Sequence, residues 1–264
     1  MKERLDQALV ARGLARSRTV AAKLVAEGSV SVNGDVATKP SQSVAATDTI
    51  TVSDSETTEF VSRAGHKLHG ALEAFTEVTV TGKRCLDAGA STGGFTEVLL
   101  RRGAKEVAAV DVGHGQLVDS LRHDPRVQVF EGMNVRYMTP EDIGGPVDLT
   151  VGDLSFISLT LVLELLAKAT KPSGDVVLMI KPQFEVGRES LAKDGVVSSP
   201  TERRRAVEKV VNHANTVGLR VNRLERSPLP GQDGNREFFA WFTVSTEAVA
   251  TERIAALLDN LDYS

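Results

Sequence analysis

The order of apolar and polar positions divides the chain into two parts with different local structure. In the first part, two helical patterns and two strand patterns follow one another, at 3–12, 17–27, 29–32 and 49–52. Gly13 and Gly28 predict the ends of the two helices, and Asn33-Gly34 predicts a hairpin turn. We therefore expect residues 1–58 to form a small module of two helices and short strands.

A polar stretch, Ser53–Glu59, separates this module from a longer region in which strand and helix patterns alternate. The strand patterns lie at 84–88, 106–111, 127–130, 147–152, 175–180, 219–226 and 237–244. The helical patterns lie at 63–75, 93–102, 115–122, 158–170, 201–217 and 246–261. Such alternation predicts parallel strands joined by helical crossovers. We expect an α/β fold, with a doubly wound, mostly parallel Rossmann-like sheet at 64–264, joined by a linker at 59–63 to the small α+β module.

The overall composition is that of a folded protein. Of 264 residues, 41% are hydrophobic and 25% are charged, which excludes a disordered chain, a collagen-like fibre and a disulfide scaffold. Cys85 has no second cysteine to pair with, which fits a reducing compartment. No apolar run reaches the roughly 18 residues of a membrane span. The first residues lead into no apolar signal core. We expect a cytoplasmic protein that does not enter a membrane.

Charge is distributed unevenly along the chain. The 31 basic and 35 acidic residues give a net charge of −4. Within residues 1–23, six basic residues face only Glu3 and Asp6, a local charge of +4, so the remainder sums to −8. The six are Lys2, Arg4, Arg12, Arg16, Arg18 and Lys23. Because salt screens charges beyond about 8 Å, a local basic face can bind phosphate even on an acidic protein. The alternative is a solvated helix face.

Two strings mark the second helix of the first module. Arg16-Ser17-Arg18 begins it, and Gly28-Ser29-Val30-Ser31-Val32-Asn33-Gly34 follows it. With the order of elements, these residues resemble the S4-type RNA-binding domain, and the resemblance implies that the basic helix pair binds structured RNA. Arginine can hold phosphate through two hydrogen bonds. The candidate RNA-binding residues of this module are Arg4, Arg12, Arg16, Arg18 and Lys23.

The string from Arg84 to Thr96 predicts a strand, a tight turn and the start of a helix. Gly89, Gly93 and Gly94 let the backbone turn sharply and a ligand approach closely. The first such turn of an α/β sheet is where a nucleotide-like cofactor binds. Asp111 closes the next strand, 22 positions after Gly89, a spacing that suits a carboxylate accepting hydrogen bonds from ribose hydroxyls.

The residues of this turn favour one class of cofactor. A dinucleotide fingerprint has glycine where this chain has Ser91, and Asp87 places negative charge beside the turn. Both features disfavour a pyrophosphate and favour a cationic, amine-bearing ligand such as S-adenosylmethionine. An unliganded structural turn and an NAD site are the alternatives. The side chain of Asn134 could face the edge of the adenine ring, or it could form a hydrogen bond with the backbone of its own turn. The candidate cofactor-binding residues are Asp87, Gly89, Ala90, Ser91, Thr92, Gly93, Gly94, Phe95, Asp111, Asn134 and Asp153.

Charged residues follow two further strand patterns. Asp153 comes after 147–152, and Lys181 comes after 175–180, where Pro182 prevents continuation. Ligands bind at the carboxyl ends of strands in open α/β sheets, so we expect these side chains at one rim. The alternative is that Lys181 reaches solvent and pairs with Asp153.

Two more charged residues complete a recognisable set. Lys67 lies in the helical pattern 63–75, and Glu237 opens the strand pattern 237–244. Taken by itself, each would be interpreted as a charged side chain on the surface. In order, Lys67, Asp153, Lys181 and Glu237 around the glycine turn resemble the Lys-Asp-Lys-Glu catalytic tetrad of FtsJ-type ribose 2′-O-methyltransferases. The strings Ser62–Leu68, Asp153–Ser158 and Ile180–Glu185, with the first module, resemble the TlyA family over nearly the whole chain.

This resemblance implies a methyltransferase that uses S-adenosylmethionine. Its implied substrates are cytidine riboses in the ribosomal RNA of the small and large ribosomal subunits, and its members are also called haemolysins. Lys181 is the expected general base. Since an unperturbed lysine has a pKa of about 10.4, we expect nearby Lys67 to lower the pKa of Lys181. Asp153 and Glu237 would orient the two lysines. We expect Asp153 not to lie close to Lys181, because a close ion pair would raise the pKa of Lys181 again.

Other residues are assigned to RNA. Arg63 and Lys67 would bring the ribose to the rim. Phe156 either stacks on a flipped base or fills the core, and its residue type favours the core. His66 and His114 lack metal-ligand spacing, so no metal is expected.

Three other functions stay open. A membrane-active haemolysin would need an amphipathic or spanning segment, but the apolar runs are short and the helix pattern 246–261 is mainly acidic. A non-catalytic RNA-binding or ribosome-assembly factor would have no use for the glycine turn and the tetrad. A different methyl acceptor, such as tRNA or a protein, is compatible with the same residues.

Overall fold

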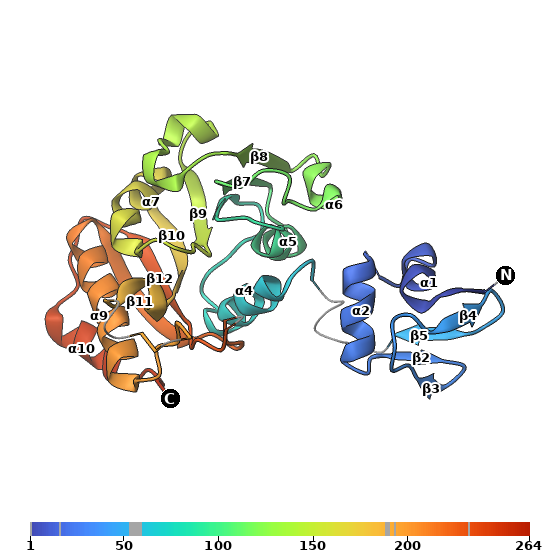
Figure 1. Cartoon of the computed structure of the whole chain (residues 1–264). Helices are drawn as coiled ribbons and strands as arrows, with labels where there is room; N and C mark the ends of the chain where they lie inside the picture. The colour runs from blue at the N-terminus through green and yellow to red at the C-terminus, as the bar shows by residue number, and fades with distance from the viewer. Residues whose placement is uncertain (1, 16, 53–59, 188–190, 193, 232) are drawn as a thin grey trace. The chain divides into compact units, whose positions relative to one another are not determined.

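The computed structural model describes residues 2–15, 17–52, 60–187, 191–192, 194–231 and 233–264 (Figure 1). Contacts within the chain divide it into two units, Met1–Arg63 and Ala64–Ser264. The polar stretch 53–59, which includes the first residue of the predicted linker 59–63, and the candidate RNA-binding residue Arg16 lie outside the described residues.

The smaller unit combines two helices with short antiparallel strands. Its helices are α1 (Leu5–Ala11) and α2 (Arg18–Ala26). Its strands are β1 (Lys2–Arg4), β2 (Val30–Val32), β3 (Asp35–Val36), β4 (Ser43–Ala45) and β5 (Ile50–Val52). The predicted hairpin is confirmed: Asn33 and Gly34 have φ of 52° and 92°, and β2 pairs antiparallel with β3. The first helix begins at Leu5 rather than residue 3, because 2–4 pair with β4.

The larger unit is built on a seven-stranded sheet. Its strands are β6 (Arg84–Ala88), β7 (Glu106–Asp111), β8 (Val127–Glu131), β9 (Val147–Gly152), β10 (Thr170–Ile180), β11 (Leu219–Arg226) and β12 (Phe238–Val244). The spatial order is β11-β12-β10-β9-β6-β7-β8. The strands from β10 to β8 pair in parallel, whereas β12 lies antiparallel between β10 and β11. The predicted mostly parallel α/β sheet is confirmed.

Helices cover both faces of this sheet. Figure 1 shows α4 (Arg63–Ala74) and α5 (Gly94–Arg101) on one side, and α7 (Leu163–Ala169), α9 (Pro200–Thr216) and α10 (Thr251–Asp259) on the other. Shorter helices are α6 (Asp119–Arg122), α8 (Pro182–Glu185), η1 (Val135–Tyr137), η2 (Pro140–Ile143) and η3 (Leu159–Leu161). Buried aliphatic residues of the strands and of α7, α9 and α10 share one core.

Two predicted helices are shorter than their patterns suggested. The pattern 115–122 yields only α6, since Gly115 takes a φ of 65° and residues 112–115 form bends. The pattern 158–170 breaks into η3 and α7, and Thr170 already pairs with Val147 of β9. In both places tertiary contacts override the local helix propensity, and a single sequence does not reveal those contacts.

Candidate active site

The sheet register brings the charged rim residues together. Ala88, the last residue of β6, is paired with Gly152, the last residue of β9. Because β12 runs antiparallel to β10, its first residue Phe238 pairs with Ile180, the last residue of β10. The residues just beyond these ends, Asp153, Lys181 and Glu237, therefore emerge at the same edge of the sheet.

Two lysine–carboxylate pairs occupy this edge. The Nζ of Lys67, on α4, lies 2.5 Å from Oε2 of Glu237, and the two side chains are 10% and 3% exposed. The Nζ of Lys181 lies 2.7 Å from Oδ1 of Asp153, with side-chain exposures of 11% and 17%. The structure thus contradicts the expectation that Asp153 stands off from Lys181. Each lysine has its own carboxylate, so the charge of Lys67 is compensated locally.

The glycine turn lies directly against Asp153. Gly89 has a φ of 88°, and a Cβ at this position would lie 2.8 Å from the backbone oxygen of Asp153. At Gly93, with a φ of 100°, a Cβ would lie 2.3 Å from Leu121 Cδ1. Gly89 therefore lets the turn approach the backbone at the end of β9, whereas Gly93 is required by its left-handed φ, since the side chain of Leu121 could move away.

Beside this turn is a cavity of about 650 Å³. Its walls include five of the predicted cofactor-binding residues, Gly89, Ser91, Asp111, Asn134 and Asp153. A cavity of this size suits a nucleoside cofactor. Of the other six predicted residues, Asp87 lies in β6, and the rest form the turn and the first residues of α5: Ala90, Thr92, Gly93, Gly94 and Phe95.

Asp111 is held by backbone amides. Its Oδ2 accepts a hydrogen bond from Ser91 N at 2.8 Å and its Oδ1 from Gly113 N at 2.7 Å. Each carboxylate oxygen keeps a second acceptor site, which a ribose hydroxyl can use. Asn134 Oδ1 accepts a hydrogen bond from Arg136 N at 3.0 Å, as expected for a residue that bonds the backbone of its own turn. Asn134 also lines the cavity.

Asp87 is a buried carboxylate with one unsatisfied oxygen. Its side chain is fully buried, and Oδ2 accepts from Thr96 Oγ1 at 2.6 Å. Oδ1 has no hydrogen-bond partner among the described residues. Burial above all, with the nearby charge of Asp153, raises the pKa of Asp87 to about 7. Because Asp87 keeps a proton in part of the molecules at neutral pH, the negative charge beside the turn comes mainly from Asp111 and Asp153, which line the cavity. This charge fits the cationic cofactor predicted there and opposes a pyrophosphate.

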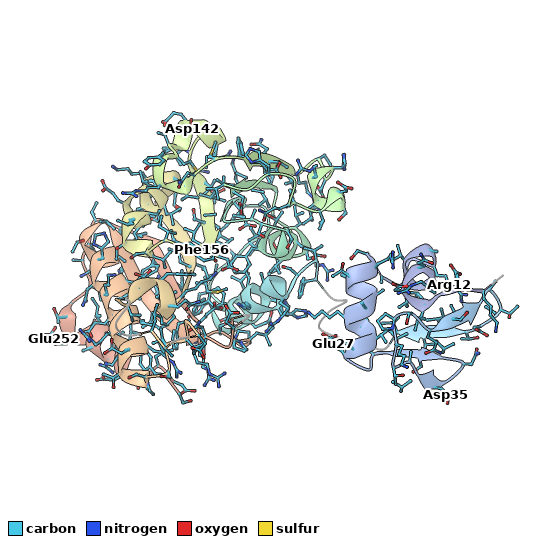
Figure 2. The ribbon with its side chains drawn as sticks, in the orientation of Figure 1. Arg12, Glu27, Asp35, Asp142, Phe156 and Glu252 are labelled. Carbon is cyan, nitrogen blue, oxygen red and sulfur yellow. The ribbon has the colours of Figure 1, made fainter. Side chains whose placement is uncertain are left out.

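Phe156 is an exposed aromatic residue in the wall of the cavity. It is 91% exposed, has a φ of 63°, and its ring lies 5.2 Å from that of Phe184. The residue is labelled in Figure 2, in the segment after β9. The interpretation as a core phenylalanine is wrong: a strained backbone holds this ring in solvent.

Two site residues were not predicted. Ser155 Oγ accepts a hydrogen bond from Lys181 Nζ at 2.6 Å and lines the cavity. Glu185, which is 5% exposed, accepts from Ser158 Oγ at 2.6 Å and from Leu159 N at 2.7 Å. Glu185 therefore ties α8 to the segment that carries Asp153 and Phe156. Both belong to strings that marked the family, but no spacing rule assigned them a contact.

The basic residues of the smaller unit are partly used inside it. Arg4 and Arg18 both pair with Asp6 at 3.0 Å, and the hydrogen bond from Arg4 is the largest cause that lowers the pKa of Asp6 to about 2. Arg12 donates to the backbone oxygens of Asp48 and Ala45 at 2.7 and 2.9 Å, so it fastens the segment before β5. Lys23 lies 3.8 Å from Glu27.

Comparison with known proteins decides the family. Residues 60–244 match the FtsJ-like methyltransferase family and residues 3–50 match the S4 domain. The chain is 52% identical to the 16S/23S rRNA (cytidine-2′-O)-methyltransferase TlyA of Mycobacterium tuberculosis, over 93% of this chain and 91% of that protein. The chain belongs to the TlyA family of FtsJ-like methyltransferases. The predicted family, enzyme class and cofactor, S-adenosylmethionine, are confirmed.

Other TlyA-family relatives carry a different name. The chain is 37% identical to Hemolysin A of Brachyspira hyodysenteriae, over 91% of this chain and 100% of that protein. The solved structure of a protein provisionally named a hemolysin, from Streptococcus thermophilus, matches with a TM-score of 0.76 and 38% identity, over 98% of this chain and 94% of that chain. Among the described helices, none combines the length and the apolar character needed to cross a bilayer.

Proposed function

We propose that this TlyA-family enzyme methylates the 2′-hydroxyl of cytidines in ribosomal RNA of the small and large subunits. The observation that carries the proposal is that two lysine–carboxylate pairs lie at one edge of the sheet and that Asp153, a member of one pair, lines the cofactor-sized cavity. Support for the substrate comes from the relative at 52% identity, which is named for this activity on 16S and 23S rRNA.

The cavity residues would hold S-adenosylmethionine, whose sulfonium supplies an electrophilic methyl group. Asp111 would accept hydrogen bonds from the ribose of the cofactor, because its oxygens keep free acceptor sites. The carboxylates of Asp111 and Asp153 line the cavity, which favours a cationic ligand over a pyrophosphate, although the ammonium of Lys181 offsets part of the charge of Asp153. Gly89 and Ser91 would let the turn approach the ligand closely.

In this proposal Lys181 takes the proton of the ribose hydroxyl. A paired ammonium cannot accept a proton, so Lys181 would first release its own proton to solvent. The Asp153 carboxylate, 2.7 Å away, would then stabilise the ammonium that forms as the hydroxyl is deprotonated. The Lys67–Glu237 pair would position the ribose next to this amine, since Glu237 and Lys181 follow from paired strand ends.

RNA would be held by three parts of the chain. The S4 domain would bind folded RNA through Arg4, Arg18 and Lys23, whose side chains are on the surface although two of them pair with Asp6. Arg63, at the start of α4, would contact phosphate near the site. Phe156 would stack on the flipped base, because its exposed ring stands beside the cavity. Binding through phosphates should weaken steeply as salt is raised.

The test is a product analysis. Purified protein is incubated with S-adenosylmethionine and either small or large ribosomal subunits, and the RNA is digested to nucleosides for mass spectrometry. The proposal predicts 2′-O-methylcytidine from both subunits. Methylation of tRNA or protein instead, or of one subunit only, would contradict the substrate assignment. Base-methylated cytidine would contradict the reaction.

A further inference from the structure

We propose that Ser155 is a positioning residue for methyl transfer, whose hydroxyl sets the direction in which the amine of Lys181 faces the substrate. The inference rests on the proposed function of Lys181 and adds a residue to it. Lys181 Nζ donates to Ser155 Oγ at 2.6 Å, in addition to its 2.7 Å ion pair with Asp153 Oδ1.

The tetrahedral geometry of the Lys181 nitrogen explains why its two neighbours, Ser155 and Asp153, affect the direction of its lone pair. A neutral lysine amine has two N–H bonds and one lone pair, and it can rotate about the Cε–Nζ bond among staggered positions. With one acceptor, the lone pair still has two positions available. Ser155 takes one N–H bond, and the carboxylate of Asp153, which is ion-paired with Nζ but accepts no hydrogen bond at Oδ1, repels the lone pair from its side. The lone pair is then left with a single favoured direction, so the base is oriented before the ribose arrives.

The chemical type of the second partner also suits a base. A second carboxylate beside Lys181 would further favour the ammonium over the amine. A serine hydroxyl accepts the N–H bond but carries no net charge, so it orients the amine with little electrostatic bias. Ser155 also lines the cofactor cavity, whereas the side chain of Lys181 is only 11% exposed. Ser155 is itself exposed, so its hydroxyl joins the wall of the cavity to a largely buried amine.

The segment that carries Ser155 is held at both ends. At its start, Asp153 N donates to Ala88 O at 3.1 Å. At its end, the buried carboxylate of Glu185 accepts from Ser158 Oγ and Leu159 N. Glu185 lies four residues after Lys181, at the end of α8, so the serine and the lysine are fixed relative to each other through this contact. Such a supported geometry is what a positioning hydrogen bond requires.

The experiment compares Ser155→Ala, Ser155→Thr and the control Ser120→Ala, which alters an exposed serine on α6. Steady-state kinetics are measured on a ribosomal RNA substrate, and S-adenosylmethionine binding is measured by calorimetry. Loss of one orienting hydrogen bond should lower kcat of Ser155→Ala about 10-fold. KM for RNA and the affinity for S-adenosylmethionine should stay within about twofold of wild type. Ser155→Thr, which keeps a hydroxyl, should recover most of kcat, and Ser120→Ala should match wild type.

Three results would overturn the inference. One is an unchanged kcat in Ser155→Ala. Another is a change confined to KM, which would indicate a binding role. The third is a Ser155→Thr enzyme as slow as Ser155→Ala, which would indicate a loop defect. Wild type and Lys181→Ala are run in parallel: methylation by wild type and none by Lys181→Ala support the proposed function whatever Ser155 does. No methyl transfer by wild type would overturn both proposals.

Discussion

Lys67 on α4 and Glu237 at the start of β12 form a buried ion pair, with 2.5 Å between Nζ and Oε2, although 170 positions separate them in the sequence. The pair connects the helix that precedes the first strand of the seven-stranded sheet to β12, the one described strand of that sheet whose two neighbours both run antiparallel to it. It therefore joins the two ends of the methyltransferase unit at the rim where Lys181 emerges.

Removing one member of this pair should destabilise the fold. Glu237→Ala or Lys67→Ala leaves an uncompensated buried charge, and we expect a loss of about 3–5 kcal/mol in the free energy of unfolding. The double variant Lys67→Met with Glu237→Leu should recover most of this stability, because neither charge remains. It should stay inactive if the pair also positions the ribose. Urea unfolding and methyl transfer measured on the same preparations check this, and an active double variant would refute the positioning role.

Asp87 should make stability depend on pH. Its pKa of about 7 in the folded protein lies above the ordinary 3.8, so the folded state retains a proton that the unfolded chain has lost. The contribution is fully present below about pH 4 and is lost as pH rises through 7, and amounts to at most about 4 kcal/mol. Asp87→Asn keeps an oxygen for Thr96 and does not titrate. The stability of wild type relative to Asp87→Asn should fall between pH 4 and pH 8; a constant difference would contradict the buried, raised pKa.

The close approach at Gly89 should be needed for cofactor binding. Gly89→Ala places a Cβ 2.8 Å from Asp153 O, whereas Gly82→Ala meets nothing within 4 Å at a similar φ of 74°. Both variants bear the cost of a left-handed residue, so their difference isolates the approach to Asp153. We expect Gly89→Ala to weaken S-adenosylmethionine binding about 10-fold or more, or about 1.4 kcal/mol, and Gly82→Ala to bind normally. Calorimetry measures the affinity of both variants for S-adenosylmethionine. Equal affinities of Gly89→Ala and Gly82→Ala would show that the close approach at Gly89 does not shape the cavity.

Phe156 should matter for RNA and not for folding. Since its ring is 91% exposed, Phe156→Ala should change the free energy of unfolding by less than about 0.5 kcal/mol. Loss of one base stack is expected to cost about 1–3 kcal/mol in RNA binding or turnover. Phe156→Tyr keeps a stacking surface and should retain most of the activity. If Phe156→Ala unfolds the protein, or methylates RNA as wild type does, the stacking role is wrong.

The fold was readable from the sequence because the central strands β6, β7 and β9 are short, mainly apolar runs, and polar or glycine residues lie at or just beyond the end of each of them. The rim residues were also foreseeable: Asp153 and Lys181 directly follow apolar strands, and such strand ends meet at one edge. The antiparallel position of β12, which brings Glu237 to this edge, carries no local signal. The family resemblance, not a pattern of spacing, pointed to that residue.

Other site contacts depend on tertiary structure. The 2.7 Å pairing of Lys181 with Asp153 contradicted the expectation, because the sequence does not determine the distance between two strand ends. Phe156 was misjudged from residue type, since its left-handed φ comes from the tethered segment around it. Arg12 looked like an RNA contact but donates to backbone oxygens 33 and 36 positions away. These are contacts between distant segments that periodicity cannot predict.

The central claim is that Lys181 is the base at this rim, and single-turnover methyl transfer by Lys181→Ala and Lys181→Arg tests it most directly. Each variant is first shown by calorimetry to bind S-adenosylmethionine as wild type does. The rate of 2′-O-methylcytidine formation in ribosomal RNA is then followed by mass spectrometry. We expect both rates to fall by at least about 100-fold, the usual contribution of a general base. Wild-type rates in either variant would contradict the claim.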